Sequence, residues 1–337
     1  MTEKTLYQQL AKAVGAEGSQ NIADIFEVLA DEKEAKVLMA ASPPATIKEL
    51  SEKTGIRKAE IEKMVNPLFL KGLLYQSKKP DAIRYYRVRR IGQMHDATAV
   101  MENPPERMLD LWKDYMTQEW CDYRIKAKEA SGGSPASRVI PVNVSIDHQN
   151  EIIAFDDVAK LMEKTDSMAV TRCSCRVIDG ACEKEVWNCM QFGKAANYAI
   201  ERGTGRRIDM KEAINILKKA EEEGLVHVVS NARSLGHIIC NCCKDCCMNW
   251  PPDHLGEKKV LVNPSRFLAA VDAGFCSSCE TCLDRCPFDA ISMEGENDTA
   301  LVDEEKCMGC GVCMVTCPEG ALSLKEIRSE EFVPAAH

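Results

Sequence analysis

Hydrophobic residues recur at helical spacing in the first part of the chain. Apolar side chains three to four positions apart predict one helix over about 22–41, which the proline pair Pro43-Pro44 ends; they are Ile25, Leu29, Val37 and Leu38. Thr46, with Glu49 three residues later, has the pattern of a capping box and predicts a short second helix over 47–53.

The pattern of hydrophobic and polar residues next predicts a third helix and two short strands. The helix is expected over about 57–71, with Gly72 ending it and four residues facing inward: Ile61, Met64, Val65 and Leu68. Residues 73–75 and 84–88 alternate in polarity as strands do, around a turn at 79–81. Residues 21–91 together resemble the winged helix-turn-helix of bacterial regulators.

In the winged-helix fold, the third helix reads the major groove of DNA. Here that helix mixes basic and acidic residues and contains Pro67, whereas a reader of bases more often presents Asn, Gln or Arg. We therefore expect a dimerisation or docking module, and nucleic-acid binding is the less favoured interpretation.

Aromatic and apolar residues predict one long core-facing helix over 104–130; they are Met108, Leu111, Trp112, Tyr115 and Trp120. Cys121 stands alone on this helix and is expected to pack rather than bind metal. Residues 131–135 have the composition of a linker. Beyond them an α/β segment is expected, with strands over 138–146, 167–171 and 225–229 and helices over 155–164, 192–202 and 209–223.

Nine cysteines lie in this α/β segment, in two groups that are each expected to follow a strand. The first group is Cys173, Cys175, Cys182 and Cys189, and the second is Cys240, Cys242, Cys243, Cys246 and Cys247. Thiolates gathered in such numbers repel one another unless a metal neutralises their charge. The sequence therefore predicts one or two further iron–sulfur clusters in this segment.

Two ligand layouts are open for these nine cysteines. In one, the first group holds one cluster and four cysteines of the second group hold another. In the other, both groups contribute to one unusual cluster. Structural zinc and reversible dithiols are alternatives, because Cys243 and Cys246 have the Cys-x-x-Cys spacing of zinc sites.

The middle segment contains three short patterns that can be compared with other proteins: Arg172-Cys-Ser-Cys-Arg176, Gly224-Leu-Val-His227 and Cys240-Asn-Cys-Cys243. With them, residues 138–247 resemble an uncharacterised cysteine-rich region that accompanies ferredoxin domains in anaerobic bacteria and archaea. This resemblance implies metal binding but no particular reaction.

The last quarter of the chain repeats one cysteine pattern, Cys-x-x-Cys-x-x-Cys-x-x-x-Cys-Pro. The copies end in Cys286-Pro287 and Cys317-Pro318. Three thiolates of one loop bind three irons of a cubane, and the fourth cysteine lies too far along to close on its own loop. The predicted ligand sets are therefore Cys276, Cys279, Cys282 and Cys317 for one cluster, and Cys286, Cys307, Cys310 and Cys313 for the other.

The repeat resembles the bacterial two-cluster ferredoxin domain over about residues 265–325, which implies two [4Fe–4S] clusters. Zinc sites or disulfides are the alternative, and the duplication with both prolines argues against them. The first loop has Ser278 and Glu280 where the second has Gly309 and Gly311, so the two clusters are expected to differ in potential.

Composition and charge limit the classes of function. The 337 residues carry a net charge of −9, with 43 Lys and Arg against 52 Asp and Glu. An acidic chain is ordinary for an electron carrier and argues against nucleic acid as a partner of any part except the N-terminal one. No apolar run approaches the length of a membrane span and the first residues lack a secretory pattern, so we expect a cytoplasmic protein. So many cluster ligands suggest an anaerobic or strongly reducing host.

The fold class expected is α+β multidomain. The expected domains are a winged helix over 1–100, a long helix and linker over 101–135, a cysteine-rich α/β domain over 136–262, a two-cluster ferredoxin domain over 263–327 and a disordered tail over 328–337.

The function expected is low-potential electron transfer, as a subunit or adaptor of an anaerobic oxidoreductase. Its redox partner would be an oxidoreductase, flavoprotein or ferredoxin, and the N-terminal domain would serve a homodimer or a partner. Two alternatives remain: a reductase with its active site at the middle cluster, and a redox-sensing winged-helix regulator of transcription. The sequence identifies no catalytic residue.

Overall fold

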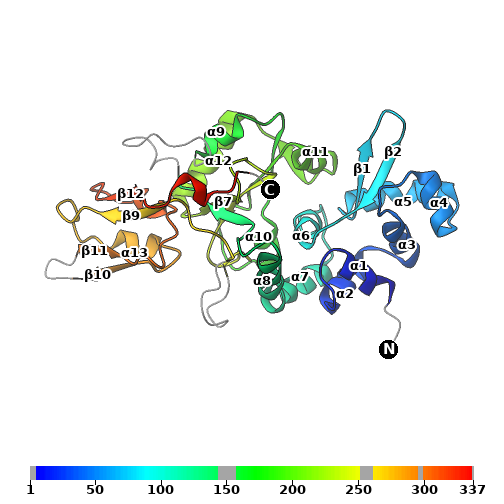
Figure 1. Ribbon diagram of the computed structural model, residues 1–337, viewed down its shortest axis with the longest axis horizontal. Coiled ribbons are helices and arrows are strands. Elements are labelled where there is room, and N and C mark those ends of the chain that lie inside the picture. Colours follow the sequence, from blue (N-terminus) through cyan, green and yellow to red (C-terminus); the bar gives the residue numbers. More distant parts are fainter. Residues whose placement is uncertain (1–4, 143–156, 251–260, 295–298, 336–337) are drawn as a thin grey trace. The chain divides into compact units, whose positions relative to one another are not determined.

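The computed structural model describes residues 5–142, 157–250, 261–294 and 299–335. Its architecture is mixed α+β, with a helical N-terminal region, a sheet in the middle and small antiparallel sheets near the C-terminus (Figure 1). The chain forms two compact units: Met1–Tyr123 with Arg172–Gly180 and Ala199–Gly205, and Arg124–Thr171 with Ala181–Tyr198 and Arg206–His337. In the described part of the chain, no helix is both long and apolar enough to cross a membrane.

Five helices open the chain: α1 (Leu6–Ala13), α2 (Gln20–Leu29), α3 (Glu32–Ala40), α4 (Ile47–Thr54) and α5 (Lys58–Leu70). The prediction of one helix over 22–41 is wrong, because the helix breaks into α2 and α3. Ala30 is extended, and the Asp31 side chain caps α3 in a capping box with Glu34. The apolar residues of the predicted stripe are nevertheless buried, so the stripe was assigned to the core correctly.

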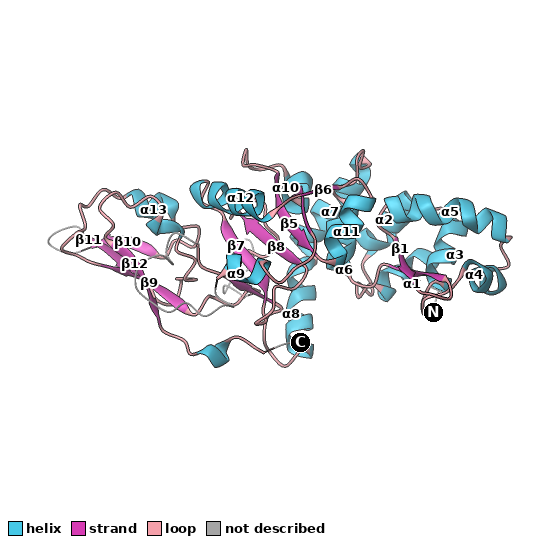
Figure 2. Ribbon diagram, turned by 90° about the horizontal axis from the view of Figure 1, so that it is seen from above, coloured by secondary structure: helices cyan, strands magenta, loops and turns pink. Residues whose placement is uncertain are grey.

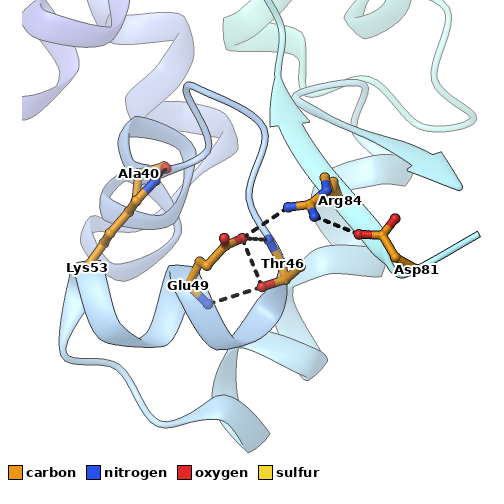
Figure 3. A network of polar contacts seen from close by, with 6 residues as sticks. All are labelled: Ala40, Thr46, Glu49, Lys53, Asp81 and Arg84. Carbon is orange, nitrogen blue, oxygen red and sulfur yellow. Dashed lines mark hydrogen bonds and ion pairs between the residues drawn. The ribbon is translucent and has the colours of Figure 1, made fainter. Parts of the chain in front are cut away.

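Strands β1 (Leu74–Lys78) and β2 (Ile83–Arg87) pair antiparallel after α5. The capping box predicted for Thr46 and Glu49 is confirmed at the start of α4. Arg84 of β2 donates a hydrogen bond to Asp81 at 2.8 Å and lies 3.6 Å from the Glu49 carboxylate (Figure 3). Hydrogen bonds from Thr46 lower the pKa of Glu49, and the charge of Arg84 adds to the effect. The polar network thus ties α4 to the hairpin.

Three further helices follow: α6 (Ile91–Thr98), α7 (Glu106–Gln118) and α8 (Trp120–Ala130). The single helix predicted over 104–130 is wrong, because the backbone leaves helical geometry at Glu119 and separates α7 from α8. Trp112 and Tyr115 are buried as expected, and the Trp112 indole donates to the Thr98 hydroxyl at 3.0 Å. Cys121 is also buried, in agreement with a packing role.

The middle region is built on a six-stranded sheet with the order β3-β7-β8-β5-β4-β6. The strands are β3 (Ser137–Val139), β4 (Met168–Arg172), β5 (Trp187–Phe192), β6 (Gly205–Arg207), β7 (Val226–Ser230) and β8 (Ile238–Cys242). The helices between them are α9 (Val158–Met162), α10 (Ser174–Asp179), α11 (Lys194–Glu201) and α12 (Met210–Glu222). Met190, Val229 and Ile239 lie in the apolar core of the sheet with Leu217 of α12.

Several predicted elements of the middle region need correction. The helix expected over 192–202 begins later, because Phe192 ends a strand, β5, that was not expected. A second unexpected strand, β8, carries Cys240 and Cys242, so the second cysteine group begins inside a strand rather than after one. The strand expected over 138–146 is shorter, and its residues 143–146 lie outside the described residues, as do residues 155 and 156 of the helix expected over 155–164.

The C-terminal region contains two antiparallel pairs, β9 (Phe267–Val271) with β12 (Leu322–Glu326), and β10 (Ile291–Glu294) with β11 (Thr299–Val302). Helix α13 (Thr281–Arg285) and the 3-10 turn η3 (Val312–Met314) contain the third cysteine of each motif, and η4 (Glu330–Phe332) lies near the end. Figure 2 shows α13 with the four strands of this region. The pairing of β9 with β12 joins the two ends of the repeat, because β9 precedes the first copy and β12 follows the second.

The tail over 328–337 is not disordered as expected, since residues 328–335 are placed against the rest of the chain. Val333 is 1% exposed and packs on the core of the middle sheet. The guanidinium of Arg233 donates to the carbonyls of Val333 and Glu330. One buried valine and these carbonyl contacts fix a segment that was expected to be disordered because it is a chain terminus.

Candidate metal centres

Two cavities lie in the C-terminal region, and each is lined by four cysteines. The first is lined by Cys276, Cys279, Cys282 and Cys317. The second is lined by Cys286, Cys307, Cys310 and Cys313. The fourth cysteine of each sequence motif thus lies at the cavity of the other motif. The cavities group the eight cysteines as the predicted ligand sets do, while ligation itself stays a prediction.

The same turn leads into both cysteine loops. The amides of Cys276 and Cys307 donate to the carbonyls of Asp272 and Asp303, at 3.1 and 2.9 Å. Both aspartate side chains also accept backbone amides of the turn; that of Asp303 accepts from Glu305 and Lys306, which lowers its pKa. These aspartates were missed, although the pattern Val-Asp-x-x-x-Cys occurs before both motifs and would have shown them.

The two cysteine loops share a backbone conformation despite different residues. Gly309 and Gly311 have φ of 63° and 76°, and the matching Ser278 and Glu280 have φ of 56° and 59°. Positive φ costs a residue with a side chain about 1 kcal/mol or more. At Gly309 a Cβ atom would collide with the Phe267 carbonyl oxygen, so glycine is required there. The first loop therefore holds strained residues where the second has glycine.

The thiols around the two cavities differ in exposure. Cys279 at the first cavity is exposed, and hydrogen bonds from the Thr281 hydroxyl and amide lower its pKa. Cys310 at the second cavity is buried, and burial raises its pKa to about 12. Thiols buried in this way remain protonated at neutral pH unless a cation takes the place of the proton. The second cavity is therefore the better shielded of the two.

In the middle region, one group of thiols converges much more closely. The Sγ atoms of Cys182, Cys243 and Cys246 all lie within 4.8 Å of one another, and those of Cys182 and Cys243 are 3.7 Å apart. Cys243 and Cys246 are buried and Cys182 is half-buried. Burial, followed by the neighbouring thiol of Cys182, raises the pKa of Cys246. Within the described residues, no other three potential ligands of this kind meet so closely.

The contacts of the middle cysteines differ from the first predicted layout, in which each sequence group binds a cluster of its own. Cys182 lies with two cysteines of the second sequence group, whereas Cys189 lies within strand β5. The Sγ atoms of Cys242 and Cys247 are 3.0 Å apart, and hydrogen bonding of Cys242 to Cys240 and Cys247 raises the Cys242 pKa. Cys173 occupies the N-cap position of helix α10 and Cys175 lies in the first turn of that helix.

Contacts join the middle cysteines to the second cavity. Arg285, next to Cys286, donates to the carbonyls of Glu221 and Glu222 at the end of α12. The ring of Phe288, which lines the second cavity, meets the Trp250 ring edge to face with centroids 5.1 Å apart. The Trp250 amide in turn donates to the carbonyl of Cys247. The second cavity therefore adjoins the middle cysteines.

A family model described as "4Fe-4S dicluster domain" matches residues 275–321. The matched segment contains all eight cysteines of the two cavities. The C-terminal region is therefore an iron–sulfur dicluster domain, and two [4Fe–4S] clusters follow from it. No curated protein matches the chain.

Proposed function

We propose that this chain is an electron-transfer protein that acts as a subunit or adaptor of an anaerobic oxidoreductase. The dicluster domain is consistent with electron transfer. One cubane would be held by the cysteines of the first cavity and the other by those of the second. The observation that carries this proposal is the crossing of Cys286 and Cys317, each of which lines the cavity of the opposite motif.

Each cubane exchanges one electron, and the protein around it sets the potential through burial, charge and hydrogen bonds to sulfur. The thiols of the second cavity are more buried, while the first cavity has the exposed Cys279 with Glu280 beside it. The two clusters would thus exchange electrons in series, with the exposed one nearer an external redox protein. The further metal proposed for the middle region would lie at the end of this series that is farther from the external redox protein.

We also propose that the N-terminal region is a winged helix used for docking or dimerisation. The support is the order α3, α4, α5 and then the β1–β2 hairpin, to which Ala45 adds a third short bridge by pairing with Tyr85. On α5, the Glu60 carboxylate pairs with Arg57 and Lys33. This pairing leaves less free positive charge on α5 for phosphates, so we do not propose DNA binding.

The domain limits remain part of this proposal: 1–100, 101–135, 136–262 and 263–327, followed by the segment 328–337. The redox partner is proposed to be an oxidoreductase, a flavoprotein or a ferredoxin. A cytoplasmic location is also proposed, because 18 cysteines without a disulfide among them fit a reducing compartment.

Anaerobically purified protein tests this function. About eight irons and eight acid-labile sulfides per chain are expected in the C-terminal region, with paramagnetic signals of two interacting clusters after reduction by dithionite. Protein with both clusters that dithionite cannot reduce, and that gives no electron to any low-potential acceptor, would contradict the proposal. A gel shift with a preferred DNA sequence that depends on the cluster oxidation state would favour the regulator instead.

A further inference from the structure

We infer that Cys182, Cys243 and Cys246 bind a single divalent, thiophilic metal ion, Zn²⁺ or Fe²⁺, and not a corner of an iron–sulfur cluster. The inference rests on the proposed function in one respect, that the middle region holds metal, and it gives the number and chemical class of that metal. It also changes the predicted grouping, because it takes Cys182 out of the set with Cys173, Cys175 and Cys189.

The first argument is the spacing of the sulfur atoms. A tetrahedral ion with metal–sulfur bonds of about 2.3 Å holds its thiolates about 3.8 Å from one another. The Sγ atoms of Cys182 and Cys243 are 3.7 Å apart, and all three Sγ atoms lie within 4.8 Å of one another. One ion fits between sulfurs at this separation.

The second argument is a comparison within the same chain. In the C-terminal region, four cysteines line each of two cavities, as the thiolates of a cubane do because each binds a different iron. Among the described residues, no three cysteines of those sets converge as the middle three do. The same chain thus distinguishes an arrangement suited to a cluster from one suited to an ion.

The third argument is the surroundings of the three thiols. They pack with Ala220 and Leu225 in a small apolar cluster at the end of α12. Three thiolates in an apolar site are stable only with a cation among them. Cys243 and Cys246 have the Cys-x-x-Cys spacing by which a tight turn presents two thiolates to one ion.

The segment that carries Cys182 is held at the same place by independent contacts. The Lys184 ammonium donates to the Glu223 carbonyl at 2.6 Å, and the Glu185 amide donates to the Glu223 carboxylate at 3.2 Å. These bonds bring Cys182 to the turn of Cys243 and Cys246, which lies 61 residues further along the chain. The three-cysteine site is thus built by the fold rather than by local sequence.

The position of this ion suggests its role. The carbonyls of Glu221 and Glu222, which lie in the chain between Ala220 and Leu225 of the same apolar cluster, accept hydrogen bonds from Arg285 beside Cys286. An ion that stabilises the segment at the end of α12 would therefore also stabilise the carbonyls that Arg285 of the dicluster domain contacts. Three protein ligands leave the fourth position of a tetrahedral ion to a further ligand.

The test is metal analysis of full-length protein purified anaerobically, compared with the variants Cys182→Ser and Cys121→Ser. A cubane has equal iron and sulfide, so the inference predicts about one metal atom per chain in excess of acid-labile sulfide. Cys182→Ser should lose this excess metal, while Cys121→Ser, which changes another buried cysteine, should keep it. Cys182 is only half-buried, and retained cluster signals in paramagnetic resonance show that the variant has folded.

Cobalt provides a second readout. Co²⁺ supplied during growth in place of zinc should give the intense visible bands of a tetrahedral thiolate site in the wild type and lose them in Cys182→Ser. The inference is overturned if metal and sulfide are equal in the wild type, or if Cys182→Ser keeps the excess metal. If the wild-type protein lacked the eight cluster irons but contained the excess metal ion, the proposed function would be contradicted and this inference would stand.

Discussion

The two cysteine regions of this chain differ in how far apart they hold their sulfur atoms. Eight C-terminal cysteines line two cavities, four to each, whereas three of the middle cysteines converge to within 4.8 Å of one another. The separation of thiolates reflects the size of what they bind, because each corner of a cubane is a separate iron while one ion draws all its ligands together. A cysteine count alone would treat the two regions alike.

The largest effect is expected from replacing a cysteine that lines one of the two C-terminal cavities. Cys286→Ser should remove the same cluster as Cys310→Ser, because both side chains line the second cavity although they belong to different motifs. Iron should fall from about eight to about four atoms per chain in each variant and no further in the double variant. Iron analysis with paramagnetic resonance measures this. An additive loss in the double variant would show that the two cysteines serve different clusters.

A second prediction compares the two cysteine loops at one position. Gly309→Ala should destabilise the dicluster domain by about 3 kcal/mol or more, because the new Cβ meets the Phe267 carbonyl oxygen at a positive φ. Ser278→Gly, at the matching position, should stabilise the domain by about 1 kcal/mol, because it relieves a positive φ. The denaturant midpoint for loss of cluster absorbance measures both. Equal effects of the same sign would contradict the structural equivalence of the loops.

A third prediction concerns the contact between the two cysteine regions. Arg285→Met removes a charged donor from the carbonyls of Glu221 and Glu222 and should cost about 2 kcal/mol of stability. The iron content should not change, since Arg285 lines neither cavity. Lys306→Met, which removes an exposed ion pair with Asp303, is the control and should have little effect. Chemical unfolding of the loaded protein separates the two variants, and equal stabilities would argue against the Arg285 contact.

Sequence patterns predicted the C-terminal cysteine grouping because the information is local and repeated. Spacing alone placed Cys286 with the second motif, and the cavities have the same grouping. The middle grouping was not predictable in this way, because Cys182 meets Cys243 only after the intervening strands and helix α12 have packed. Cys189, only seven positions from Cys182, is held elsewhere by strand β5, which the pattern of polarity did not indicate.

Helix boundaries were also predictable where they depend on residues close in sequence, and less so where they depend on packing with distant residues. The capping box at Thr46 was predicted because both of its residues are close in sequence. The break between α2 and α3 was missed, although Asp31 and Glu34 have a capping pattern, because the apolar stripe continues across it. The ordered tail was missed because Val333 finds its buried position in a core formed by residues far away in sequence.

The smallest effect is expected in helix α4, outside both cysteine regions. It serves as a reference for the variants of those regions. The pKa of Glu49 is lowered in the folded protein, so its contribution to stability is present above its unfolded pKa and is lost as the pH falls through the folded pKa. Glu49→Gln should therefore increase hydrogen exchange in α4 at pH 7, and the difference should shrink as the pH falls through the folded pKa of Glu49. Glu52→Gln, whose carboxylate only approaches Lys48 at 3.9 Å, is the matched control. Removal of the metals should leave the exchange of α4 unchanged.

The proposed function requires that the chain accepts and returns electrons through two cubanes. Anaerobic coulometric titration of the loaded full-length protein, followed by paramagnetic resonance, tests it most directly. The account predicts about two electrons per chain, taken up at two different potentials and fully returned on oxidation, with the signal of Cys310→Ser reduced to one electron. Uptake of no electrons by protein that contains both clusters, or uptake that is not returned, would contradict the account.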